Sequence, residues 1–375
     1  MKKILYFFPF NPIEKKDGSK TRALELLKYF KEKGFELDFV YEKNIDNNAA
    51  HDVLLKDMNL ANNIWSIKRR PNTFSFHYLI YKFHKLFLRK KTSLNNLFFD
   101  KQFNKILKNN TYDYIIISYA TYAGLINRKH NLKNATTIID THDFLTAQIQ
   151  DKNKLKIGQY FQDEINRLRQ FDEVWAISND ELYVFSQFVS NVKLVPFTTT
   201  DAIKGIEHLN RKFDVLYVAS ENPHNLKAAK WFFSEVYPLL EPTLRIAVVG
   251  KICKHIGVFE NVTKFNFIDD LSEIYNTSKI TICPMLSGTG VKIKVIESLF
   301  FGLPVVTNYR GIDGLPNKTR NGCFVTNSHI TFAGYIANLL ENKALYNIAK
   351  TEATHFFNEH FSKKIIYNIL DESFK

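Results

Sequence analysis

Short apolar runs alternate with longer amphipathic stretches along the first half of the chain. The apolar runs predict strands at residues 4–8, 37–41, 114–118, 136–139, 173–177 and 193–195. Between the first two runs, apolar positions repeat with helical spacing over residues 21–33, and the pattern stops at Gly34, as is typical of a helix C-terminus. The alternation predicts a mostly parallel sheet with helices on both faces.

A second series of the same kind begins at Val215. It predicts a helix near residues 224–236 and strands at residues 215–218, 245–249, 264–267, 280–283, 305–307 and 323–325. The polar segment 198–211 separates the two series and is the predicted hinge. Because 375 residues exceed the size of a usual single core, we expect two α/β domains.

A turn with two glycines follows the apolar run at residues 280–283 and leads into a predicted helix that carries a lysine and a glutamate. Gly288 and Gly290 permit a tight turn with amide N–H groups exposed at a helix N-terminus, where phosphates bind readily. Lys294 and Glu297 are three residues apart and share one face of that helix, whereas Val291, Val295 and Leu299 repeat on a neighbouring face that can enter the core. Lysine can neutralise a phosphate, and the carboxylate can accept hydrogen bonds from ribose hydroxyls. The segment predicts a nucleoside diphosphate site, and the plain alternative is a turn that only keeps the connection compact.

The whole segment from Ser287 to Val306, SGTGVKIKVIESLFFGLPVV, resembles the donor-site signature of glycosyltransferase family 4, whose members are retaining enzymes with the GT-B fold. Glu297 matches the second of two glutamates that the family spaces seven residues apart, and Thr289 stands in the place of the first. Because Thr289 replaces the first glutamate, the contact that this glutamate makes to the sugar in the family is in question for this chain.

The resemblance implies the GT-B architecture, with two Rossmann-like, doubly wound parallel-sheet domains facing a central cleft. It places an acceptor-binding domain at residues 1–198, with residues 361–375 crossing back to it, and a nucleotide-sugar-binding domain at residues 199–360. The resemblance is weakest between about residues 44 and 110.

The resemblance also implies which other residues bind the donor. The family often has an arginine after the strand at 215–218 and a lysine some residues later, but Ser220 and Asn222 stand at the arginine position. Asn225 and Lys227 are alternatives for part of that pair, although Asn225 can instead cap the following helix. The complete predicted donor-binding set is Gly18, Ser19, Asn225, Gly250, Lys251, Ile268, Gly288, Thr289, Gly290, Val291, Lys294 and Glu297.

A second candidate cluster, Asp140 to Asp143 with the sequence DTHD, follows a strand of the first series. It therefore falls at the carboxyl end of a parallel sheet, where open α/β folds place their ligands. His142 resembles the family's strand-end histidine and can hydrogen-bond a sugar hydroxyl, and Asp140 or Asp143 can engage the acceptor. The predicted catalytic residues are His142, Asp143, Lys294 and Glu297.

Composition changes this picture in only a few respects. The net charge of +13 favours an anionic partner. Basic and aromatic residues mix between Lys68 and Lys91, and this segment is expected either to lie on an anionic membrane surface or to be a core helix with a solvated basic face. No recognition element accompanies the charge, so we expect no nucleic acid partner. Three cysteines without paired spacing indicate no metal site and a reduced, cytoplasmic setting. If the basic segment binds lipid, the protein is expected to attach peripherally to the inner face of the plasma membrane.

The sequence thus predicts a metal-independent, hexosyltransferase-type retaining glycosyltransferase that needs no cofactor beyond its nucleotide-diphosphate-sugar donor. Its acceptor is expected to be a glycan or glycolipid of bacterial surface polysaccharide biosynthesis, for capsule or lipopolysaccharide. The alternatives are a nucleotide-sugar epimerase, an inverting GT-B enzyme, and a non-catalytic protein that binds membrane surfaces and has a decayed donor site.

Overall fold

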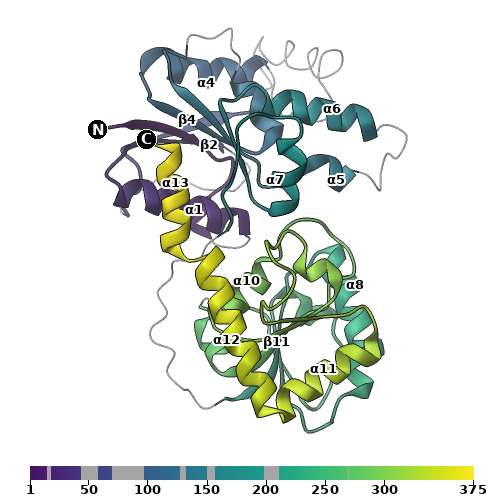
Figure 1. Cartoon of the computed structure of the whole chain (residues 1–375). Coiled ribbons are helices and arrows are strands. Elements are labelled where there is room, and N and C mark those ends of the chain that lie inside the picture. Colours follow the sequence, from purple (N-terminus) through teal and green to yellow (C-terminus); the bar gives the residue numbers. More distant parts are fainter. Residues whose placement is uncertain are drawn as a thin grey trace. The chain divides into compact units, whose positions relative to one another are not determined.

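A computed structural model of the chain describes residues 1–14, 18–43, 58–69, 97–126, 132–149, 157–197, 211–268 and 270–375. The chain forms two compact units, Met1–Pro196 and Phe197–Lys375 (Figure 1). None of the helices in these ranges is both long enough and apolar enough to span a bilayer.

The first unit contains a seven-stranded parallel sheet in the order β3-β2-β1-β4-β5-β6-β7. Its strands are β1 Lys3–Phe7, β2 Glu36–Lys43, β3 Asn63–Lys68, β4 Tyr114–Ser118, β5 Thr136–Asp140, β6 Glu173–Ala176 and β7 Val192–Leu194. Its helices are α1 Gly18–Glu32, α4 Leu97–Asn109, α5 Leu145–Ile149, α6 Ile157–Leu168 and α7 Asn179–Ser186. The central strand β4 is buried along its whole length, because helices cover both faces of a parallel sheet.

The second unit contains a six-stranded parallel sheet in the order β10-β9-β8-β11-β12-β13. Its strands are β8 Phe213–Val218, β9 Ile246–Val249, β10 Val262–Phe265, β11 Ser278–Cys283, β12 Val305–Thr307 and β13 Cys323–Val325. Its helices are α8 Pro223–Trp231, α9 Ser272–Asn276, α10 Ile293–Phe300, α11 His329–Glu341, α12 Lys343–His360 and α13 Lys363–Ser373. A π-helical turn, Phe232–Val236, continues α8.

The predicted fold class is confirmed, since both units are α/β units built on parallel sheets. Strand β3 was not predicted, because most of its residues are exposed or half-buried and give no apolar run. Gly18 and Ser19, two of the predicted donor residues, were expected in a loop after the first strand, but they form the first turn of α1. In α10, Val295 and Leu299 are buried in the core as predicted, whereas Val291 precedes the helix.

Some sequence predictions fall outside what the structure describes. The hinge predicted at 198–211 lies almost wholly in residues 198–210, and the basic aromatic segment lies mainly in residues 70–91, both outside the described ranges. Residues 361–375 are grouped with the second unit. The central cleft, the crossing back of residues 361–375 and the separate acceptor and donor roles of the units stay predictions.

All three cysteines are free thiols. Cys253 and Cys283 are buried, and Cys323 is half-buried. Burial raises the pKa of each of the three thiols above its ordinary value.

Candidate functional site

The predicted donor segment lies where two neighbouring strands of the second unit end. Strands β8 and β11 pair in parallel, so the loops that follow them emerge at the same edge of the sheet. The strand order reverses between these two strands, and open α/β sheets bind ligands at such a switch point. The loop after β11 contacts the start of α8, because Nδ1 of His224 lies 2.9 Å from Oγ of Ser287.

The glycine turn of this segment has the backbone conformation that its sequence predicts. The φ angle is 98° at Gly288 and 76° at Gly290, in the region that favours glycine. A Cβ atom on Gly288 would lie 3.2 Å from Cγ of His224, so the glycine turn and the start of α8 approach closely at this residue. Helix α10 begins only at Ile293, and Thr289 is therefore part of the turn rather than of the helix.

Lys294, the second residue of α10, is half-buried and faces the end of β8 and the start of α8. Its Nζ donates a hydrogen bond of 3.1 Å to Oδ1 of Asn225 and lies 5.7 Å from the ring centre of Tyr217. Lys294 forms no ion pair with any carboxylate in the part of the chain that the structure describes. Burial lowers the pKa of this lysine, because the site supplies too little negative charge to offset its desolvation. An anionic ligand would supply that charge.

Glu297 lies one turn further along α10 and is also half-buried. Its Oε2 accepts a hydrogen bond of 3.1 Å from the hydroxyl of Tyr275. Burial raises the pKa of Glu297 to about 7, against the lowering effects of the Tyr275 hydroxyl and the Lys294 charge. The carboxylate thus has polar neighbours and is not enclosed by hydrocarbon alone.

Lys292, which was not predicted as a site residue, closes the glycine turn. Its Nζ donates hydrogen bonds to the backbone oxygens of Thr289, at 3.2 Å, and Gly290, at 2.6 Å. Lys292 is only 8% exposed, and burial lowers its pKa. The signal available in the sequence was a lysine two residues after Gly290. In this structure Lys292 stabilises the turn through hydrogen bonds to its backbone, whereas Lys294 faces Asn225 at the start of α8.

Asn225, in the first turn of α8, connects the loop after β8 to α10. Its Nδ2 donates a hydrogen bond of 3.0 Å to the backbone oxygen of Ser220, while its Oδ1 accepts from Lys294. The alternative role predicted for Asn225 is wrong, because Asn222 caps α8 by accepting a 2.9 Å hydrogen bond from the Asn225 amide. Lys227 is exposed on α8. Asn225 therefore orients Lys294.

Three more predicted donor residues lie in the loops that follow β9 and β10. Gly250 has φ 110° and packs so tightly on the end of β8 that a Cβ atom would lie 2.2 Å from the backbone oxygen of Ala219. Lys251 is exposed at the start of a short 3-10 helix, and Ile268 is half-buried against a small apolar cluster.

Substituting Gly250 with alanine is expected to destabilise the second unit by more than 2 kcal/mol, because strained backbone and backbone overlap add together. Gly34→Ala is the matched control, since Gly34 also has positive φ, 71°, but has no atom within 4 Å of the new methyl group. The free energy of unfolding of that control should fall by only about 1 kcal/mol, because a non-glycine residue is strained in the left-handed backbone region. Urea unfolding of both variants tests the difference, and equal losses would contradict the packing described for Gly250.

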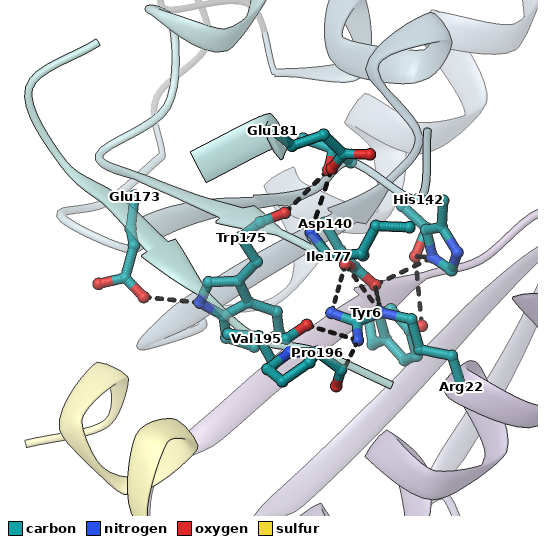
Figure 2. A network of polar contacts seen from close by, with 12 residues as sticks. Tyr6, Arg22, Asp140, His142, Glu173, Trp175, Ile177, Glu181, Val195 and Pro196 are labelled. Carbon is teal, nitrogen blue, oxygen red and sulfur yellow. Dashed lines mark hydrogen bonds and ion pairs between the residues drawn. The ribbon is translucent and has the colours of Figure 1, made fainter. Parts of the chain in front are cut away.

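The DTHD cluster of the first unit contains a buried ion pair at the end of β5 (Figure 2). Nε and Nη2 of Arg22 donate to the carboxylate of Asp140 at 2.8 to 3.0 Å, and both side chains are almost fully buried. Nη1 of Arg22 also donates to the backbone oxygens of Val195, at 2.8 Å, and Pro196, at 3.1 Å. Burial alone would raise the pKa of Asp140, but the charges of Arg22 and His142 outweigh it and hold that pKa well below its usual range. Asp140 therefore stabilises the fold. Both of its carboxylate oxygens already contact Arg22, so they are not available for the predicted contact with an acceptor.

His142 is held in place by the same cluster. Its Nε2 lies 2.9 Å from Oδ2 of Asp140 and 3.1 Å from Oγ of Ser118. The ring of Tyr119 stacks on the imidazole, with ring centres 4.3 Å apart. Both His142 and Tyr119 have positive φ, 60° and 69°, and strain of this kind in non-glycine residues is concentrated at functional sites. Nδ1 of His142 makes no hydrogen bond within the described ranges and is the atom left to meet a ligand.

Asp143 and Glu181 are two carboxyl groups beside this cluster with raised pKa values. Burial raises the pKa of Asp143 to about 6, despite the nearby charge of His142 and a hydrogen bond from Gln148. Burial raises the pKa of Glu181 to about 7, although Thr141 and the backbone amide of Ile177 donate to it, each at 3.1 Å. Among the described residues, no three His, Cys, Asp or Glu side chains are grouped so as to hold a metal ion.

The structure therefore gathers the predicted residues into two clusters, one in each unit. The first contains His142 and Asp143. The second contains Asn225, Gly288, Thr289, Gly290, Lys294 and Glu297, with Gly250, Lys251 and Ile268 on the adjacent strand ends.

Comparison with known proteins agrees with this geometry. Residues 212–342 match the family model described as "Glycosyl transferases group 1". A relative is the uncharacterized 44.6 kDa protein in the cps region of Klebsiella pneumoniae, which is 22% identical over 397 residues that cover 100% of both chains.

Solved structures show the fold of the whole chain. HepE from Anabaena, in complex with UDP and glucose, superposes with a TM-score of 0.69 at 15% identity, covering 100% of this chain and 99% of its own. Sucrose-phosphate synthase from Thermosynechococcus elongatus gives 0.72 at 13% identity, with 100% and 98% coverage. TarM of S. aureus gives 0.68 at 14% identity, also with 100% and 98% coverage. The predicted resemblance to GT-B glycosyltransferases is confirmed, and family 4 within that group stays a prediction.

Proposed function

We propose that this protein is a retaining glycosyltransferase that moves a sugar from a nucleotide-diphosphate-sugar to a hydroxyl group of a glycan or glycolipid. The observation that carries the proposal is the half-buried ammonium group of Lys294, which lacks a carboxylate partner among the described residues and stands beside a glycine turn at the switch point of the sheet. An unneutralised cation in such a place suits a diphosphate.

In the proposed reaction, Lys294 and the amides of the glycine turn stabilise the charge that develops on the departing diphosphate. Glu297 accepts hydrogen bonds from the ribose and so fixes the donor in the reactive position. The acceptor oxygen bonds to the anomeric carbon on the face from which the phosphate oxygen leaves, and the acceptor proton passes to that phosphate oxygen. His142, through Nδ1, binds a sugar hydroxyl, and Asp143 lies beside it.

Two findings support a role in bacterial surface polysaccharide synthesis. The Klebsiella relative is named from a cps region. The net charge of +13 suits an acceptor carried on an anionic lipid or membrane surface. We therefore place the enzyme in the cytoplasm, with peripheral attachment to the inner face of the plasma membrane through residues 68–91.

A screen of UDP-, GDP- and ADP-sugars is expected to find at least one donor that the protein hydrolyses slowly and transfers faster when a glycan acceptor is added. The product should keep the anomeric configuration of the donor, and an excess of EDTA should leave the rate unchanged. Nuclear magnetic resonance of the first-formed product reads out the configuration.

Other outcomes identify the alternatives. An inverted product would indicate an inverting GT-B enzyme, and an altered free nucleotide-sugar would indicate an epimerase. Absence of any stabilisation by nucleoside diphosphates, together with binding to anionic vesicles, would indicate the non-catalytic membrane protein and would sink the proposal.

A further inference from the structure

Glu297 does not hold its orientation alone, because α9 supplies a tyrosine that contacts it. Tyr275 is 1% exposed, and its hydroxyl donates to Oε2 of Glu297 at 3.1 Å. Its ring stacks face to face on Phe301, with centres 4.8 Å apart and planes 6° apart. A ring that is fixed on one face by a stack has little freedom to turn its hydroxyl away. The hydroxyl is therefore a fixed reference point for the carboxylate.

The two oxygens of Glu297 consequently differ. Oε2 is occupied by Tyr275, whereas Oε1 makes no hydrogen bond within the described residues and is not among their buried, unpartnered polar atoms. Oε1 is thus the oxygen that a ligand can reach. A carboxylate with one oxygen tied down and the other open can accept hydrogen bonds from neighbouring hydroxyl groups in one defined direction.

We infer that Tyr275 is a positioning residue for the nucleotide, which holds Glu297 so that Oε1 meets the ribose 2′- and 3′-hydroxyls and thereby favours ribonucleotide over 2′-deoxyribonucleotide donors. This inference rests on the proposed function, since it assigns a ribose to Glu297. A site built to hydrogen-bond a hydroxyl rejects the analogue that lacks it, because its polar group is then left unpaired.

The charge state of Glu297 gives a second, independent signature. The titratable groups that face it are Tyr275 on α9 and Lys294 on its own helix. With a pKa of about 7, Glu297 is increasingly protonated below neutral pH, and the neutral acid is a poorer acceptor for two hydroxyls. Nucleotide affinity should therefore fall as the pH drops through about 7. Removing the tyrosine hydroxyl removes an interaction that favours the carboxylate, so this fall should move to higher pH.

The test compares Tyr275→Phe with the wild type by calorimetric titration of UDP and 2′-deoxy-UDP, and of GDP and 2′-deoxy-GDP, between pH 6 and 9. We expect the ribonucleotide that binds to lose affinity by roughly 10-fold or more, as for a hydrogen bond to a charged group. The 2′-deoxy form should lose less, so the preference for ribose shrinks, and the pH midpoint should rise.

Tyr346→Phe is the matched control, because this half-buried tyrosine also donates one hydrogen bond, of 3.1 Å, to the backbone oxygen of Lys279. It should leave both the ribose preference and the pH midpoint unchanged. Phe301→Leu removes the ring stack but keeps the hydroxyl, so it should give a smaller loss in the same direction and serves if Tyr275→Phe folds poorly.

The outcomes separate the inference from the proposed function. If Tyr275→Phe and Phe301→Leu bind ribonucleotides with the wild-type preference and pH midpoint, the inference is overturned while the proposed function stands. If the wild type binds neither UDP nor GDP, and no other nucleoside diphosphate stabilises it, both are overturned.

Discussion

Replacing Lys294 with alanine is expected to lower kcat by about 100- to 1,000-fold with little change in stability. Lys294 is the half-buried cation on α10 beside the glycine turn, and it forms no ion pair in the described part of the chain. Removing one preorganised group that stabilises developing charge typically costs about 3–4 kcal/mol of transition-state stabilisation. Because desolvation of the lysine opposes folding, its loss should not unfold the unit.

Lys227→Ala provides the matched comparison. Lys227 is exposed on α8 close to the same loop, and the sequence alone made it an alternative contact for the diphosphate. We expect its turnover to stay within about threefold of the wild type, since an exposed charge is screened by solvent. Single-turnover measurements at saturating donor separate the two variants. Near-normal turnover in Lys294→Ala would show that the diphosphate is held elsewhere.

Replacing Arg22 with methionine is expected to destabilise the first unit by about 3–5 kcal/mol, because it leaves the buried carboxylate of Asp140 without its partner. The guanidinium group also holds the backbone oxygens of Val195 and Pro196, which end this unit. Hydrogen exchange followed by mass spectrometry should show faster exchange in peptides of residues 1–196 and unchanged exchange in the second unit.

Arg245→Met is the control for this variant. Arg245 makes a similar two-pronged contact with Asp214, at 3.1 and 3.2 Å, but its side chain is 52% exposed. Lys279 also stays 2.8 Å from Asp214, so the loss should be below about 1 kcal/mol. Equal effects of the two substitutions would mean that the Arg22 pair is not the buried anchor described above.

The stability that this pair provides should depend on pH in a definite direction. The pKa of Asp140 is lower in the folded chain than in the unfolded chain. The pair therefore stabilises the first unit above the unfolded-state pKa of about 4, and this contribution is lost as the pH falls below that value. In Arg22→Met, the stability of the first unit should therefore fall less between about pH 5 and about pH 2 than in the wild type.

The sequence predicted the sheet strands well where they are buried on both faces. Residues such as Ile115, Ile116 and Ile117 of β4 form apolar runs because helices cover both sides of a parallel sheet. Strand β3 was not predicted for the opposite reason. It lies at an edge of the sheet, and the exposed fraction of Trp65 is 38%. The less exposed edge strands β7, β10 and β13 were predicted, so the exposure of β3 rather than its place at the edge removed the apolar run.

The donor segment was predictable because its chemistry is local in the sequence. Gly288, Gly290, Lys294 and Glu297 lie within ten residues, and turn and helix geometry alone bring them together. The partners that position them come from distant segments, as with Tyr275, and periodicity carries no information on such pairs.

The same limit applied to the first unit. The sequence pointed to His142 but not to Arg22, which lies 118 residues before its partner Asp140. One signal was present, because Arg22 stands directly before the buried residues Ala23 and Leu24 of α1. An arginine on the apolar face of a helix usually has a buried counter-ion.

The low reactivity expected of the three native thiols makes this chain suitable for labelling at introduced cysteines. Maleimides react with the thiolate form, and Cys253, Cys283 and Cys323 all have raised pKa values. The native protein should therefore take up dye slowly at neutral pH without any cysteine being removed. Gln187→Cys in the first unit and Lys343→Cys in the second, both at exposed positions, would then carry the dyes. Energy transfer between them would report, molecule by molecule, whether a nucleotide brings the two halves of the chain together.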